Sequence, residues 1–241
     1  MTTSSTSRPS SSDGTISLTV RGAGAPVVRV RCSRRSDGDF HPHHSPLGQL
    51  RRRQRAFVDA PWTMLDQSHG ATAVEVEQPG SHDGSPGDVM ATGSSGAVLG
   101  CWAADCAPIV VVGAGSRMAV AHAGWRGIVA GVLDAAVASC DAPVLAVALG
   151  PVIGPCCYQL ADSDIELVAD RLGLPPTAIR GRSVRGVGSL DVPAVIGWFA
   201  ERLGVPLVRI GGCTGCEFPG FSYRVRQDPG RHVVAVWQEE S

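Results

Sequence analysis

Four apolar runs in the middle of the chain constrain its fold more than any other feature of the sequence. They read AVLGCWAA at 97–104, PIVVVGA at 108–114, RMAVAHA at 117–123 and VLAVALG at 144–150. Each run has the length of a β-strand and is too short for a typical helix. A strand exposed on one face alternates apolar and polar residues, whereas a strand covered on both faces is almost entirely apolar. The runs therefore predict a sheet whose central strands are covered on both sides.

After the third run the apolar period changes from that of a strand to that of a helix. Apolar residues now recur at spacings of three and four, at Trp125, Ile128, Val129, Val132, Leu133, Ala136, Val137 and Cys140. This period predicts one amphipathic helix that begins near Gly124 and continues to Cys140.

Shorter patterns predict the remaining elements. Strands are expected at 16–20, 26–33, 73–78, 206–210 and 232–237. Helices are expected at 50–58, 162–173 and 191–204, the last with Asp191 as its N-cap. Strands in runs with interspersed helices favour an α+β fold, a single mixed-sheet α/β domain, over a regular βαβ winding. We assign this domain to residues 15–241 and predict that the Ser/Thr/Pro-rich residues 1–14 form a disordered tail.

Composition excludes several kinds of chemistry and of partner. The net charge of −1 gives no general attraction to nucleic acid or to an anionic membrane, and no apolar run reaches the length of a membrane span. All 21 basic residues are arginine, which excludes a Schiff-base lysine and a P-loop lysine. The N-terminal residues lack the apolar segment of a secretory signal, which predicts a cytoplasmic protein with reduced thiols.

Two histidines and one cysteine form the strongest candidate for a functional site. Cys106 lies in the turn between two predicted strands, His122 ends a strand just before the helix, and His69 precedes another strand. Two imidazoles and one thiolate are a three-ligand zinc set that leaves a fourth position open for water or substrate. The same residues also suit a Cys106–His122 nucleophile pair, or two loop histidines and a core cysteine. Spacing alone does not decide among these readings.

Charged residues beside these positions are candidates for substrate binding. Arg126 falls in the first turn of the predicted helix, where free backbone N–H groups and the helix dipole favour an anion. The alternative for Arg126 is an ordinary exposed helix arginine. Asp105 is adjacent to Cys106, where an aspartate would orient a histidine, transfer a proton or hold the turn.

The other cysteines are interpreted as structural. CTGC at 213–216 has the C-x-x-C spacing of redox motifs and zinc ribbons, but the sequence has no second C-x-x-C to complete a ribbon. We interpret Cys213 and Cys216 as structural residues, and the adjacent cysteines at 156–157 are similarly ambiguous. HPHH at 41–44 is interpreted as part of a loop.

Six motifs occur in the order in which one known family has them. They are DQSHG, AADCAPI, AHAGWRG, GPVIGPCCYQL, CT and FSYRVRQDPGRHVVAVW, and AHAGWRG with an upstream ADC is highly specific. From about residue 26 to its C-terminus the chain resembles the YfiH/laccase-domain family. Members of that family were first regarded as multicopper polyphenol oxidases and are now regarded as zinc-dependent purine nucleoside phosphorylases.

The resemblance implies a function as well as a fold. It implies zinc ligands, and hence a catalytic centre, at His69, Cys106 and His122, in a single mixed α/β domain of the YfiH or cysteine-hydrolase-like type. The implied reaction is phosphorolysis of adenosine and inosine, and of methylthioadenosine, with adenosine deamination as an associated activity. The implied partners are a purine nucleoside and phosphate, with no nucleic acid and no membrane, in a monomer or small homo-oligomer. We expect Arg126, Arg224 and Asp105 to bind or orient the substrate.

The chain departs from the family pattern near the expected site. SDGDFHPHHSPLGQL at 36–50 replaces a longer stretch in a loop that we expect to border the substrate pocket. In SYRVRQDPGR, one residue separates Arg224 from Arg226, whereas the family has two adjacent arginines here. The pattern therefore leaves open which of the two faces the site. A multicopper oxidase needs many paired histidines, and seven in the whole chain cannot build its copper centres, so copper is less favoured than zinc.

Two functions of other kinds are alternatives. One is a cysteine- or metal-dependent amide hydrolase that edits a cell-wall precursor, with Cys106 as the nucleophile; chelation would spare a purely thiol-dependent enzyme. The other is a binding or regulatory protein without turnover, and the intact set of His69, Cys106 and His122 argues against it.

Overall fold

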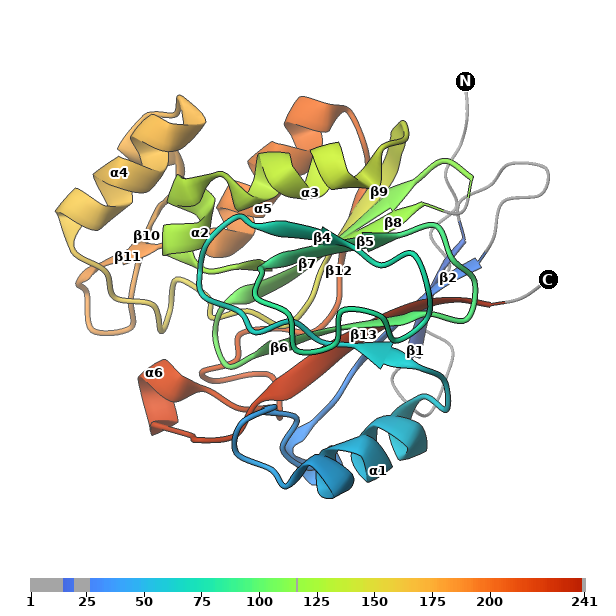
Figure 1. Ribbon diagram of the computed structural model, residues 1–241. Helices are drawn as coiled ribbons and strands as arrows, with labels where there is room; N and C mark the ends of the chain where they lie inside the picture. Colours follow the sequence, from blue (N-terminus) through green and yellow to red (C-terminus); the bar gives the residue numbers. More distant parts are fainter. Residues whose placement is uncertain (1–14, 20–26, 116, 240–241) are drawn as a thin grey trace.

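Two mixed sheets lie face to face at the centre of the fold (Figure 1). The computed structural model describes residues 15–19, 27–115 and 117–239, so the predicted tail at 1–14 lies outside the described residues. The five-stranded sheet has the order β1-β2-β13-β6-β3. Its strands are β1 (Thr15–Thr19), β2 (Val27–Cys32), β13 (His232–Glu239), β6 (Val98–Ala103) and β3 (Trp62–Thr63).

The second sheet has six strands in the order β12-β9-β7-β8-β5-β4 and contains both parallel and antiparallel pairs. Its strands are β12 (Leu207–Arg209), β9 (Val144–Leu149), β7 (Ala107–Gly113), β8 (Met118–Ala123), β5 (Val89–Thr92) and β4 (Ala73–Glu75). A separate hairpin joins β10 (Arg180–Arg182) to β11 (Gly188–Leu190).

Helices cover the outer faces of both sheets. Helix α1 (Leu47–Phe57) packs on the five-stranded sheet, and α3 (Val132–Cys140), α4 (Asp162–Leu172) and α5 (Val192–Leu203) pack on the other side of the molecule (Figure 1). The short elements are α2 (Trp125–Ala130), α6 (Tyr223–Arg226), and the 3₁₀ turns Arg35–Asp37 and Pro176–Ala178. The predicted mixed-sheet α/β fold is therefore confirmed.

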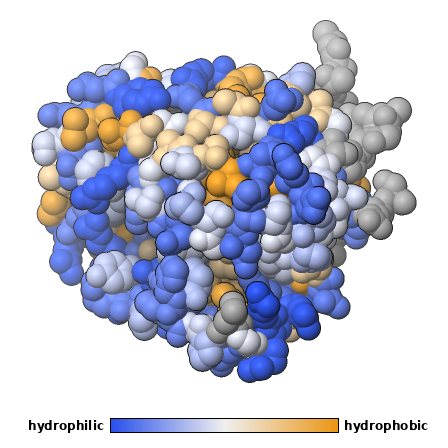
Figure 2. Space-filling view, in the orientation of Figure 1, coloured by the Kyte–Doolittle hydropathy of each residue, from blue (hydrophilic) through white to orange (hydrophobic). Residues whose placement is uncertain are grey.

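The layers explain the apolar runs. In β7, Ile109 and Val111 face the helices, while Val110 and Val112 face the five-stranded sheet. Both sets are fully buried, so no position on the strand selects a polar residue. The space-filling view shows the complementary exterior, where hydrophilic residues predominate and apolar ones form small groups (Figure 2). No helix in the described part of the chain is long and apolar enough to cross a membrane.

The structure corrects the prediction of one helix from Gly124 to Cys140. The chain forms α2 and α3 instead, because Gly131 lies between them in the left-handed region at φ 96°. The apolar period continues across the break, since both helices bury the same face. Strands β3, β5, β10 and β11 and helix α6 are all short and were missed.

We predict that two glycine-to-alanine substitutions in helical regions have opposite effects. Gly131→Ala places a Cβ at positive φ and lowers the free energy of unfolding by about 1 kcal/mol. Gly197 lies within α5, and nothing lies within 4 Å of a Cβ added there. Gly197→Ala therefore raises the free energy of unfolding by about 0.5–1 kcal/mol. Urea titrations of both variants and the wild type measure the difference. Equal effects of both substitutions would contradict this account of the helix break.

Candidate metal centre and adjoining pocket

Strand pairing brings Cys106 and Asp88 to His122. β7 and β8 pair antiparallel with Pro108 opposite His122, and Cys106 comes just before the paired segment of β7. β5 pairs with the other edge of β8, and the His122 N–H donates to the carbonyl of Asp88 at 2.8 Å. His122 shares its face of β8 with Met118, so its ring lies at the end of the layer between the sheets.

The side chains of the three predicted ligands lie close together in the structure. One ligand atom from each of His69, Cys106 and His122 lies within 4.8 Å of the other two. Cys106 Sγ is 3.6 Å from His69 Nε2, and the two imidazole rings have centroids 4.8 Å apart. Ligands of a tetrahedral ion with bonds of about 2.0–2.3 Å are roughly 3.3–3.8 Å apart. The donor set and its dimensions therefore fit a metal ion.

Gly124 has no side chain, and this provides space for two of the predicted ligands. A Cβ on Gly124 would lie 2.7 Å from His69 Cδ2 and 3.0 Å from Cys106 Sγ. Such contacts are shorter than van der Waals separation, so any side chain here would push the ligands apart. The glycine of AHAGWRG is therefore part of the centre, although it supplies no ligand atom.

A buried carboxylate orients two of the ligands. Asp88 accepts backbone N–H bonds from Ser68, His69 and Gly70 at 3.2, 2.9 and 2.7 Å, and its Oδ1 lies 2.9 Å from His122 Nδ1. Burial would raise the pKa of Asp88, but the bonds from His122, Gly70 and Ser68 lower it to about 2. With Nδ1 donating to Asp88, the other ring nitrogen of His122 is available to a metal.

Asp105, and not Asp88, was the residue predicted from the sequence for this orienting role. Asp105 instead binds Thr214 Oγ1 at 2.7 Å and the backbone N–H of Arg224 at 2.6 Å. It has a φ of 107°, which holds the turn immediately before Cys106. Asp88 directly precedes the buried residues VMAT, which form the missed strand β5, and that short run was its only signal.

The thiol and the imidazole of the centre shift each other's ionisation. Burial would raise the pKa of Cys106, but His122 and His69 lower it to about 6. Burial would likewise lower the pKa of His122, but Cys106 and Asp88 raise it to about 9. Each group therefore favours the charged form of the other. A thiolate is also the form that binds a metal.

Two arginines predicted to bind substrate line a common pocket. Arg126 and Arg224 both line this pocket, whose volume is about 440 Å³. The Arg224 guanidinium lies 5.2 Å from the Tyr158 ring centroid, and the Arg126 guanidinium lies 4.4 Å from that of Trp125. Asp105 connects the pocket to the centre, since it binds the Arg224 backbone and is followed by Cys106. Two cations beside a metal site suit an anionic ligand.

The structure also separates the roles of the two C-terminal arginines. Arg226 binds the carbonyls of Thr214, Gly215 and Gly220 and pairs with Asp228 at 3.0 Å. Through these bonds the Arg226 guanidinium stabilises the loop that contains residues 214–220. Of the two arginines, Arg224 is the one that lines the pocket.

Tyr158 was missed by the sequence analysis. Its side chain is 7% exposed, and burial together with the charge of Cys106 raises its pKa, so the hydroxyl stays protonated. Arg224 and Arg126 oppose this shift, so the hydroxyl lies within the electrostatic reach of both. Nothing in GPVIGPCCYQL distinguishes this tyrosine from a core residue.

The HPHH loop approaches the centre through one tryptophan. The ring of His41 lies 4.8 Å from that of Trp102, which lies 6.3 Å from that of His122. Trp102 therefore lies between this loop and His122, and no described residue of the loop lines the pocket of Arg126 and Arg224.

Comparison with known proteins identifies related sequences and structures. The sequence profile of the family described as multi-copper polyphenol oxidoreductase laccase matches residues 47–239. A purine nucleoside phosphorylase of Pseudomonas aeruginosa is 35% identical over 205 residues, which cover 79% of each chain. An adenosine deaminase from an unknown prokaryotic organism is 29% identical over 166 residues, covering 63% of this chain and 62% of its own. The crystal structure of YlmD from Geobacillus stearothermophilus superposes with a TM-score of 0.76 at 26% identity, covering 96% of this chain and 98% of that one.

We predict that Asp88→Asn weakens metal binding roughly 10- to 100-fold, because it removes the acceptor that orients His122. It also lowers the free energy of unfolding by about 1–3 kcal/mol, since three backbone N–H groups and the His122 ring lose a buried, charged acceptor. The pKa of Asp88 is lowered in the folded state, so its contribution is complete above about pH 4 and is lost as the pH falls through about 2. The wild type and the variant should converge in stability over that range.

Metal titration and urea unfolding at several pH values check both effects. The control is Asp66→Asn, an exposed aspartate that pairs with His43 outside the centre. A stability difference between wild type and D88N that stays constant down to pH 2 would contradict the role of its charge.

We predict that Gly124→Ala lowers the bound metal to well below one ion per chain, because its methyl group displaces His69 and Cys106. Elemental analysis of the purified protein measures the metal, and circular dichroism checks the fold. Gly197→Ala, with open space around its new methyl group, is the matched control. A G124A protein with its full metal content would show that the space beside the ligands is not needed.

Proposed function

This chain belongs to the multi-copper polyphenol oxidoreductase laccase family, and we propose that it is a zinc-dependent purine nucleoside phosphorylase. The phosphorylase part rests on relatives that carry that name, among them the one from Pseudomonas aeruginosa. The zinc part rests on the donor set of two histidines and one cysteine. Adenosine, inosine and methylthioadenosine are the proposed nucleosides.

The observation that carries the proposal is that Asp105, which precedes the ligand Cys106, also binds the backbone of Arg224, a residue of the arginine-lined pocket. Three protein ligands leave a coordination position open, as in catalytic rather than structural zinc sites. Arg126 and Arg224 supply two cations where a phosphate would have to bind. A multicopper oxidase would need several copper centres, and the seven histidines of this chain include only two in this one.

In the proposed reaction a phosphate oxygen bonds to C1′ of the ribose while the bond from C1′ to the purine breaks. The electron pair of that bond leaves with the purine, which takes up a proton at nitrogen. The products are ribose 1-phosphate and the free base. Arg126 and Arg224 would bind and orient the phosphate. Tyr158, whose ring lies 5.2 Å from the Arg224 guanidinium, would donate a hydrogen bond from its protonated hydroxyl.

His69, Cys106 and His122 would hold the zinc ion, and Asp88 would keep His122 in the tautomer that binds it. Zinc, when bound, would supply Lewis acidity at this point. Deamination needs an activated water as its nucleophile, and one relative is named an adenosine deaminase. We therefore propose adenosine deamination as a side activity of the same centre.

The closeness of the Cys106 thiol to the His122 ring favours a second candidate, a cysteine-dependent amide hydrolase. Cys106, with its pKa lowered to about 6, and His122, with its pKa raised to about 9, form a thiolate–imidazolium pair. Such a pair is the activated form of a thiol nucleophile. A chelator separates the two candidates, because it would remove phosphorolysis and leave a thiol hydrolase active.

We predict that the purified protein releases adenine from adenosine only when phosphate is present, and that a chelator abolishes the release. Zinc restores the activity, and His122→Ala has neither the activity nor the zinc of this centre. Chromatography separates adenine from inosine and so measures phosphorolysis and deamination in one assay. Chelator-resistant hydrolysis of an amide substrate, blocked by iodoacetamide, would instead support the second candidate.

We predict that Arg126→Gln and Arg224→Gln each lower kcat/KM for phosphate by roughly 10- to 100-fold, the effect of losing one charge-assisted hydrogen bond. Zinc content stays unchanged, because neither arginine is a ligand. Arg55→Gln, on an exposed position of α1, is the matched control. An unchanged KM and kcat in both variants would remove the pocket from the phosphate site.

A further inference from the structure

Two cysteine pairs that are far apart in the sequence meet in the fold. Cys156 and Cys157 lie in the loop after β9, and Cys213 and Cys216 lie in the loop after β12. β9 and β12 are parallel neighbours, so both loops leave the same end of the sheet, and a bridge between Val152 and Cys213 joins them. We call these four cysteines the thiol cluster. The second pair that a zinc ribbon needs is thus present in space, although it lacks the C-x-x-C spacing.

The dimensions of the thiol cluster are those of a site for one ion. Cys156 Sγ lies 3.5 Å from Cys213 Sγ and 3.6 Å from Cys216 Sγ, and all four sulfurs lie within 4.8 Å of one another. Sulfurs that bind one tetrahedral zinc ion at about 2.3 Å are roughly 3.8 Å apart. The sulfurs of a disulfide are bonded at about 2.05 Å, and the four cysteines are free thiols here.

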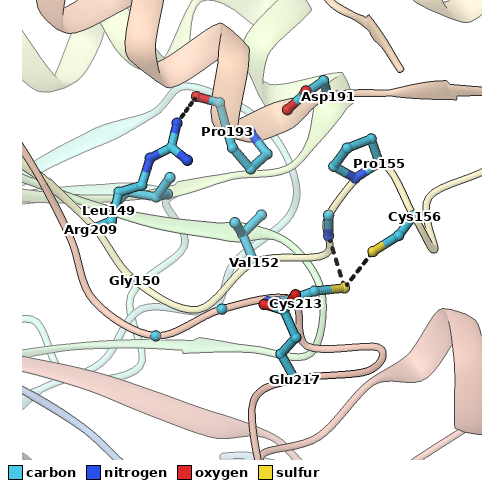
Figure 3. Close-up of a pocket in the computed structure, with 13 residues that line it drawn as sticks. Leu149, Gly150, Val152, Pro155, Cys156, Asp191, Pro193, Arg209, Cys213 and Glu217 are labelled. Carbon is cyan, nitrogen blue, oxygen red and sulfur yellow. Dashed lines mark hydrogen bonds between the residues drawn. The ribbon is translucent and has the colours of Figure 1, made fainter. Parts of the chain in front are cut away.

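The backbone around the cluster is shaped for close approach of the sulfurs. Gly154 donates its N–H to Cys213 Sγ at 3.1 Å, and Cys156 Sγ approaches the same sulfur from the side (Figure 3). A Cβ on Gly215 would lie 2.8 Å from Cys157 Sγ, and one on Gly154 would lie 3.3 Å from Cys156 Sγ. Glycine at both positions therefore lets the two loops bring their thiols together.

The surroundings also suit a metal with negatively charged ligands. Arg226 binds the carbonyls of Thr214 and Gly215, which places a guanidinium against the loop that carries Cys213 and Cys216. A pocket of about 410 Å³ reaches Cys156 and Cys213 and gives an ion a path to the cluster (Figure 3).

We propose that the thiol cluster binds one zinc ion through all four sulfurs, as a structural site distinct from the centre at His122. Four sulfur ligands in a tetrahedron select zinc or iron, and a closed set of four is typical of structural zinc. Binding releases the protons of the thiols as zinc–sulfur bonds form, and needs no oxidant. This inference does not depend on the proposed phosphorylase activity.

An ion in the thiol cluster would stabilise two loops that contact residues of the proposed active site. Thr214, which lies between the two loop cysteines, donates to Asp105 at 2.7 Å, and Asp105 precedes Cys106. Tyr158 follows Cys157 and packs against the Arg224 guanidinium. Zinc in the cluster would therefore fix the loops that position Asp105 and Tyr158.

The first test is zinc content measured by elemental analysis on protein purified with a reductant. We expect about two zinc ions per chain in the wild type and about one in the double variant Cys156→Ser/Cys216→Ser. His122→Ala should also keep about one, which belongs to the thiol cluster. Cys32→Ala, a buried cysteine of β2 outside both sites, is the control and should keep both.

Equal zinc content in the wild type and the double variant would overturn the proposal. So would an intact mass that reveals a disulfide within the cluster of the reduced, purified wild type. Loss of zinc only in the His122→Ala protein would leave the proposed phosphorylase intact and remove this second site. Loss of zinc only in the double variant would support the thiol cluster as a zinc site and remove zinc from the proposed phosphorylase centre.

The second test uses the wild type and does not depend on how the double variant folds. Cobalt in place of zinc gives sulfur-to-metal absorption whose intensity grows with the number of bound thiolates. We expect two classes of bound cobalt, one with several thiolates and one with a single thiolate. Alkylation of the native protein should leave the four cluster thiols protected until a chelator is added. Full reactivity of Cys216 without chelator would overturn the proposal.

Discussion

The apolar layer between the two sheets is the feature on which the rest of the structure depends. It is built from one face of each sheet, with the other faces covered by α1 on one side and by α3 to α5 on the other. Both faces of β7 and β8 are buried, and the strands pair from Ala107 opposite Ala123 to Val112 opposite Met118, which places their ends. His122 and Cys106 lie where this layer ends, so strand pairing sets their positions, and the bonds of Asp88 fix the loop that carries His69.

The buried carboxylate of Asp88 joins that framework to the chemistry. Its backbone carbonyl accepts the N–H of His122, and its side chain binds the ring of the same residue. It also accepts the N–H groups of the loop that carries His69. One side chain thus orients ligands from two separate segments. The same arrangement serves a metal ion or a thiolate–imidazolium pair, and for this reason chelation, rather than geometry, distinguishes the two proposed chemistries.

Much of the fold could be predicted from the sequence, because long buried strands have an unmistakable composition. The runs at 97–104, 108–114 and 117–123 became β6, β7 and β8, and Asp191 caps α5 as expected. The resemblance supplied the three ligands, and the structure brings them together. Asp88 and the thiol cluster were not predicted, because their partners are set by pairing between distant segments. Local spacing cannot reveal that 156–157 lies against 213–216, since the contact arises from the pairing of β9 with β12 and the bridge between Val152 and Cys213.

Asp105 joins three segments through one side chain and one strained backbone position. Its carboxylate binds Thr214 and Arg224, its carbonyl accepts the N–H of Ile153, and its φ of 107° is rare for an aspartate. A replacement must satisfy all of these demands at once. Among homologous sequences, a substitution of Asp105 should therefore be accompanied by a change at Thr214, so that the two positions covary.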